Sequence, residues 1–285
     1  MGKGKRIAAL TMARNDGFFL SRWLRYYAGE LGAENLFVLL DGLDQELPDA
    51  ERYPGVNVTS LPHPSLPRAK GDKYRIAQLN ALAAKLLSDE GYDIAIGTDC
   101  DEFIVVDPLL DQPLADYLST TSFPIGLSPL GIDLGQRLPQ EPTLDPGRSI
   151  LAQRRYGVLS PRYTKASIKA TPTPWGSGFH RFRQHGYTIA ANLYLIHTGN
   201  CDLELLETKM RDGARLEGGW QGHLARRAKT IHATTKRTPR PADELFSAAR
   251  RAFQRTHLPW SPNKPSYFGP PLVVELPQRF ERITI

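Results

Sequence analysis

The order of strand-like and helix-like segments in the first hundred residues constrains the fold most strongly. Short apolar runs, typical of buried strands, alternate with longer segments whose apolar residues recur at helical spacing. We expect strands at residues 7–12, 36–40, 56–61 and 92–97, and helices at 17–31, where Asp16 is placed as the N-cap, and at 72–87. Strand, helix, strand, strand, helix, strand is the order of a mostly parallel sheet with helices on its faces. The sequence therefore predicts the α/β class.

The second half of the chain has a weaker pattern. Eight prolines, at positions 124, 129, 139, 142, 146, 161, 172 and 174, are expected to break the middle into loops. Beyond them we expect a strand at 189–196 and helices at 203–212 and 242–253. We therefore divide the chain into a regular half, residues 1–125, and a looser part of the same domain, residues 126–285.

The composition is that of a globular protein. The hydrophobic fraction of 41% and the charged fraction of 23% argue against disorder of the whole chain. Only Cys100 and Cys201 are present, without Cys-x-x-Cys spacing, so a disulfide framework and a thiolate zinc site are both disfavoured. The apolar run after the basic N-terminus is too short for a signal peptide, and no run approaches a membrane span. These features favour a cytoplasmic protein.

The net charge of +6 comes from one segment. Residues 226–255 contain nine Lys or Arg and two acidic residues, and the rest of the chain is essentially neutral. This distribution indicates a local anionic partner, such as a diphosphate, an anionic acceptor or the inner face of a membrane, and no nucleic acid is expected. The ordinary alternative is a solvated basic face.

Polar clusters follow three of the predicted strands, at residues 14–16, 41–44 and 99–102. Ligands of open α/β sheets bind beyond the carboxyl ends of the strands, so these clusters are expected along one edge. Asp99 and Asp101 repel each other unless a cation or protons intervene. Hard oxygen ligands suit Mg²⁺ or Mn²⁺, which keep open positions for substrate phosphates. The alternative is a solvated turn at the end of a strand.

Three segments carry a resemblance to a known family. They are residues 11–16 with the aromatic helix up to residue 33, the segment 93–103 containing Asp-Cys-Asp-Glu-Phe, and Leu195-Ile196-His197 followed by Lys209-Met210. Together they resemble family 2-like glycosyltransferases with the GT-A fold. The resemblance implies a GT-A (Rossmann-like) sheet with helices on both faces. The first half of the chain would then bind a nucleotide sugar, and the second half would face the acceptor.

The resemblance also implies roles for individual residues. Ala13, Arg14 and Asp41 would border the base and ribose of the donor. Asp99 and Asp101 would serve the ribose and the metal, and His197 would be a late ligand of the metal or the diphosphate. Arg14 stands where related sequences often have Lys, and Cys100 stands where an apolar residue is usual.

Other candidates rest on their positions in the sequence. His197 ends an apolar segment, and a neutral imidazole binds Mn²⁺, although a half-buried structural histidine is the alternative. Asp16 belongs to the first strand-end cluster. Lys70 lies where it could meet phosphates at a helix N-terminus, or it could be exposed in the first turn. Trp220, beside glycines, could stack on a sugar or anchor a loop.

The predicted activity is metal-dependent sugar transfer from a nucleoside diphosphate, with UDP favoured, to a hydroxyl of a saccharide or lipid-linked acceptor. Mn²⁺ or Mg²⁺ is the expected cofactor. Asp133, Asp202 and Glu204 are candidate general bases, because they lie in the half expected to close over the site. Two alternatives stay open. One is a metal-dependent nucleotidyltransferase or phosphate-cleaving enzyme, and the other is a non-catalytic protein that binds anionic polymers.

Overall fold

Four parallel strands form one end of the sheet, in the order β3–β2–β1–β4. They are β1 (Ile7–Ala13), β2 (Leu36–Asp41), β3 (Asn57–Leu61) and β4 (Ile94–Gly97). The computed structural model describes residues 4–183, 185–211, 221–257 and 264–285. The four predicted strands lie within two residues of these bounds, and the predicted α/β class with a parallel central sheet is confirmed.

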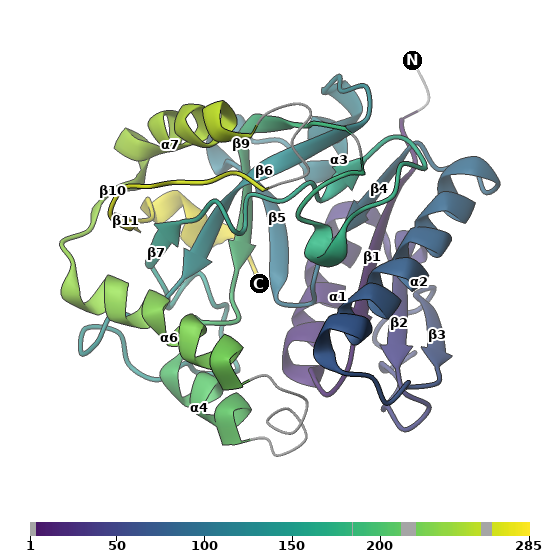
Figure 1. The fold of residues 1–285 in the computed structure, drawn as a ribbon, viewed down its shortest axis with the longest axis horizontal. Helices are drawn as coiled ribbons and strands as arrows, with labels where there is room; N and C mark the ends of the chain where they lie inside the picture. The colour runs from purple at the N-terminus through teal and green to yellow at the C-terminus, as the bar shows by residue number, and fades with distance from the viewer. Residues whose placement is uncertain (1–3, 184, 212–220, 258–263) are drawn as a thin grey trace.

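Helices α1 (Gly17–Leu31) and α2 (Arg68–Ser88) cover this parallel part of the sheet. The crossovers run from β1 to β2 and from β3 to β4, which are opposite directions along the sheet, so right-handed connections put the helices on opposite faces. Figure 1 shows α2 passing in front of the strands. The main-chain carbonyl of Asp16 accepts hydrogen bonds from the first turn of α1, as expected of an N-cap, but its side chain makes no capping bond.

The centre of the molecule contains two strands that the sequence did not predict, together with the predicted strand near residue 190. β9 (Thr188–His197) pairs in parallel with β6 (Gly126–Leu134) and antiparallel with β5 (Glu102–Val106). The expectation that Pro129 opens a loop is wrong, because Pro129 lies inside β6. The register of β6 against β9 shifts between Ser128 and Leu130. Such an irregularity tolerates a residue without a backbone N–H.

The remaining elements extend the sheet and cover it. The strands are β7 (Tyr156–Leu159), β8 (Ile168–Lys169), β10 (Arg240–Pro241) and β11 (Leu272–Glu275). The helices are α3 (Leu114–Thr120), α4 (Leu203–Arg211), α6 (Gln221–Lys236) and α7 (Ala242–Thr256). Short 3-10 turns are η1 (Ala33–Asn35), η2 (Pro108–Leu110), η3 (Ser177–Phe179) and η4 (Gln278–Arg282).

One sheet connects both parts of the chain, in the order β10–β11–β7–β6–β8–β4–β1–β2–β3, with β9 paired to β6 and β5 paired to β9 (Figure 1). The predicted helices near residues 203 and 242 are confirmed as α4 and α7, whereas α6 was not predicted. Among the described helices, none combines the length and the apolar character that a membrane crossing needs.

Candidate metal and donor site

The register of three strands brings the site together. His197 is the last residue of β9, and it lies opposite Glu102 of β5 on one side and opposite Asp133 of β6 on the other. Asp101 directly precedes β5, and its main-chain carbonyl accepts hydrogen bonds from Thr198. The strand pairing therefore places Asp101, Glu102 and Asp133 around His197, although His197 is far from all three in the sequence.

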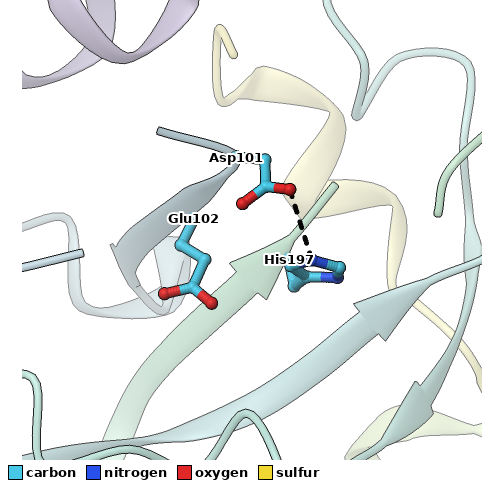
Figure 2. Close-up of side chains that lie close together, drawn as sticks. All are labelled: Asp101, Glu102 and His197. Atoms are coloured by element: carbon cyan, nitrogen blue, oxygen red, sulfur yellow. Dashed lines mark ion pairs between the residues drawn. The ribbon is translucent and has the colours of Figure 1, made fainter. Parts of the chain in front are cut away.

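Asp101, Glu102 and His197 form a buried cluster that could hold a divalent cation. Each offers one ligand atom, and these atoms lie within 4.8 Å of one another. Figure 2 shows the Asp101 carboxylate facing the His197 ring, with Oδ2 3.5 Å from Nε2. Two carboxylates and an imidazole are a donor set that divalent metals such as Mn²⁺ accept. Glu102 was part of the sequence motif, but the sequence did not single it out as a ligand.

Asp133 orients the His197 ring. Its Oδ1 lies 2.6 Å from His197 Nδ1, and its carboxylate also accepts hydrogen bonds from Asn200 at 3.0 Å and Thr230 at 2.5 Å. Because Nδ1 is held, Nε2 is the nitrogen that faces Asp101. Ligating histidines commonly have such a carboxylate behind them. The structure thus places the predicted base Asp133 behind His197 and not among the residues that line the cavity.

The charges around His197 favour its cationic form. Burial lowers the pKa of His197, but Asp101 and Asp133 outweigh burial and raise it to about 9. A cation bound at Nε2 would therefore have to replace a proton there. The ring of Tyr163 stacks on His197 with 3.9 Å between centroids, which restricts its rotation.

Two cations of the chain hold Asp99. Arg75 Nη2 lies 2.9 Å from Oδ1 and Lys165 Nζ lies 3.3 Å from Oδ2. Burial opposes the charged form, but Lys165 and Arg75 outweigh it and lower the pKa of Asp99 to about 2. Asp99 is therefore occupied by these ion pairs, and the carboxylate directed at His197 is that of Asp101.

Lys165 also neutralises Glu102. Its Nζ lies 2.5 Å from Oε1 of Glu102, and both side chains are buried. Burial raises the pKa of Glu102 to about 7, and the Lys165 charge opposes that rise. For Lys165, burial lowers the pKa, but Glu102 and Asp99 outweigh burial and raise it. Lys165 is an internal counter-ion for the acidic strand ends.

A cavity of about 360 Å³ opens beside this cluster. Its volume lies within the range of small-molecule sites. Four of the predicted site residues line it, namely Asp16, Asp99, Asp101 and His197. The other ionisable residues in its wall are Arg68, Asp72, Arg75, Glu102, Arg162, Lys165 and His180. The walls therefore present carboxylates from the strand ends and cations from α2 and the segment before β8.

Ala13, Arg14 and Asp41 lie at the carboxyl ends of β1 and β2, as predicted, but they do not line the cavity. Ala13 is buried. Arg14 pairs with Asp44 at 2.9 Å and donates to the Asp41 carbonyl at 2.6 Å, while the Asp41 side chain contacts His63 at 2.9 Å. The structure thus puts these residues at the predicted edge and links Arg14 to Asp41.

Four predicted residues lie away from the cavity or outside the described residues. Asp202 is buried in an ion pair with Arg154 at 2.7 Å, which closes it off from any acceptor. Glu204 is exposed at the start of α4, and Lys70 is exposed in the first turn of α2. Trp220 lies outside the described residues.

The basic segment 226–255 contains most of α6 and α7. In its described part, Lys229, His232, Lys236 and Arg237 line a shallow surface hollow together with Pro271. This hollow shares no residue with the cavity beside His197.

Sequence reasoning missed Lys165 and Arg162. They lie between two short strands in a proline-rich region, and no motif marks them. The structure also pairs Arg75 of α2 with Asp99, a contact that the sequence did not indicate.

Comparisons with known proteins add little to this geometry. The sequence matches no protein-family model and no curated protein. One similar solved structure is a mannose-1-phosphate geranyltransferase from Thermus thermophilus. It is 14% identical over 95% of this chain and 74% of that chain, with a TM-score of 0.32. A TM-score this low supports no inference about the activity of this chain.

Proposed function

We propose that the protein is a glycosyltransferase that uses a nucleoside diphosphate sugar, UDP-linked in the first instance, and a divalent cation, Mn²⁺ or Mg²⁺. The observation that carries this proposal is the arrangement of Asp101 and His197 beside a cavity at the carboxyl ends of parallel strands. Ligands of open α/β sheets bind at such an edge. The family resemblance of the motif around Asp99 and Asp101 points the same way.

Asp101 and His197 are the residues that would hold the cation, and Glu102 lies within reach. A bound divalent cation would supply electrostatic stabilisation of the negative charge on a diphosphate leaving group. The donor set fits this purpose, because Asp133 already fixes the ring so that Nε2 faces Asp101.

Two cationic residues of the cavity, Arg75 and Lys165, would contact the diphosphate. Arg75 and Lys165 are held in place by Asp99 and Glu102, so their remaining N–H groups are positioned before the donor binds. Hydrogen-bond donors that are fixed in advance stabilise developing negative charge without reorganising during the reaction. The nucleoside would extend towards Arg14 and Asp41 at the ends of β1 and β2.

A nucleotidyltransferase is a second candidate. The same cavity wall carries Arg68, Arg75, Arg162 and Lys165, and a wall this rich in cations also suits a nucleoside triphosphate. The two reactions differ in their products. Release of pyrophosphate from a triphosphate and a sugar phosphate would favour nucleotidyl transfer, whereas release of UDP from a UDP-sugar would favour sugar transfer.

Calorimetry of UDP binding with and without Mn²⁺ tests the proposal. Replacement of Asp101 by Ala should abolish the metal-dependent part of UDP binding, because it removes the carboxylate that faces His197. Asp116→Ala, at an exposed position of α3, is the matched control and should bind like the parent protein. Metal-dependent UDP binding that survives in D101A would contradict the site.

A further inference from the structure

Two cations near the cavity have no acidic partner within the part of the chain that the structure describes. Arg162 lines the cavity, whereas Lys264 is partly exposed, lies outside the cavity lining and belongs to the segment before β11. Among the described residues, no carboxylate forms an ion pair or hydrogen bond with either side chain, whereas Arg75 and Lys165 each have one. Arg162 and Lys264 therefore leave positive charge available to a ligand.

Lys264 lies within range of the charges of Arg162 and Lys165. Burial lowers the pKa of Lys264, and the positive charges of Arg162 and Lys165 lower it further. Burial also keeps the His180 ring neutral by lowering its pKa, with Lys165 and Lys264 contributing in the same direction. Arg162 and Lys165 both line the cavity, where like charges repel each other, and a bound anion would relieve that repulsion.

The segment that carries Arg162 is fixed on both sides. Tyr163 stacks on His197, and the Thr164 hydroxyl donates to the Ser160 carbonyl at 2.9 Å and accepts from the Gly131 N–H at 3.0 Å. A side chain at Gly131 would overlap the backbone of Tyr163 and Thr164, so this close approach requires glycine. Arg162 is thus presented from an ordered turn, which lowers the entropic cost of binding a ligand.

The position of the cluster in the sheet separates it from the nucleoside. Arg162 follows β7 and Lys264 precedes β11, and both strands lie on one side of β4, whereas β1 and β2 lie on its other side. The strand ends that carry Arg14 and Asp41, where the nucleoside is proposed to extend, belong to β1 and β2.

We propose that Arg162 and Lys264 form a subsite for a phosphate group carried by the acceptor. The assignment to an acceptor rests on the proposed sugar transfer. The subsite specifies a phosphorylated acceptor, whose phosphate oxygens would pair with the guanidinium of Arg162. The donor diphosphate is the other source of the same chemistry, and the experiment has to separate the two.

Titration of inorganic phosphate by calorimetry separates them. In one arm the protein is saturated with UDP and Mg²⁺, and in the other it is free of metal and nucleotide. Phosphate should bind in both arms. R162A and K264A should each weaken phosphate binding about tenfold, the loss of one charge-assisted contact, while UDP affinity stays within about twofold.

The controls address charge and folding. Arg183→Ala removes the same charge at an exposed position outside the cavity wall and should leave phosphate binding unchanged. R162K keeps the charge and should recover part of the affinity, while equal melting temperatures would show that the variants fold.

Three results would overturn the proposal. They are the absence of phosphate binding to the parent protein, displacement of phosphate by UDP, and an equal loss of UDP and phosphate affinity in R162A. If UDP did not bind at all, the proposed function would fail. Arg162-dependent phosphate binding in the metal-free arm would then keep the anion site but overturn its assignment to an acceptor.

Discussion

Replacement of Asp202 by Ala should strongly destabilise the protein. The Asp202 and Arg154 side chains are 1% and 0% exposed and lie 2.7 Å apart. Asp202 also accepts hydrogen bonds from the main-chain N–H groups of Leu144 at 2.8 Å and Leu205 at 3.0 Å. Removing one partner leaves the Arg154 guanidinium buried without a counter-charge, which costs about 3–5 kcal/mol. That is a large part of a typical unfolding free energy of about 5–15 kcal/mol.

Urea denaturation measures this loss directly. At roughly 2–4 °C per kcal/mol for a chain of this size, the melting temperature should also fall by roughly 6–20 °C. Glu204→Ala, two residues away and exposed, is the control and should stay within about 0.5 kcal/mol of the parent protein. The double variant R154M/D202L removes both charges and should regain most of the stability.

The same variants decide the role of Asp202. A D202A protein with parental stability would refute the structural assignment. If that stable protein also lost sugar transfer, the sequence-based prediction of a general base would be restored.

Two further predictions concern Asp133 and Lys169. D133N should weaken Mn²⁺ binding about 10- to 100-fold in nucleotide-free titrations, because the His197 ring loses its carboxylate partner; unchanged affinity, with D116N as control, would speak against that role. Burial lowers the pKa of Lys169 to about 7 from an unfolded value of 10.5. Between these pH values the unfolded chain binds one more proton than the folded chain. The unfolding free energy should therefore rise with pH across this window, by about 1 kcal/mol per pH unit. K169M should lack this rise in urea denaturation at pH 7.5 and 9. If the unfolding free energy of K169M and of the parent protein changed equally with pH, the Trp175 ring, whose centroid lies 3.8 Å from Nζ, would be keeping Lys169 charged.

The parallel end of the sheet could be predicted because its signals are local. Each strand from β1 to β4 is a short apolar run, and α1 and α2 repeat apolar residues at helical spacing. The position of Asp101 at a strand end follows from the same local pattern. Its partner His197 was found because it ends the apolar run of β9.

The rest of the site depends on contacts between distant segments. Asp133 meets His197 through the pairing of β6 with β9, and β6 was missed because Pro129 was expected to break it. Lys165 follows no motif, and only the folded chain brings it to Glu102. The basic cluster of Arg162 and Lys264 also joins residues about a hundred positions apart.

The ammonium group of Lys165 has a consequence for handling the protein. Clusters of acidic side chains often need a metal to fold, because their mutual repulsion is otherwise too large. Here a lysine of the same chain already compensates two of those acids, so the architecture should persist in chelator. The divalent cation would then bind and dissociate together with the substrate, and folding would not depend on it.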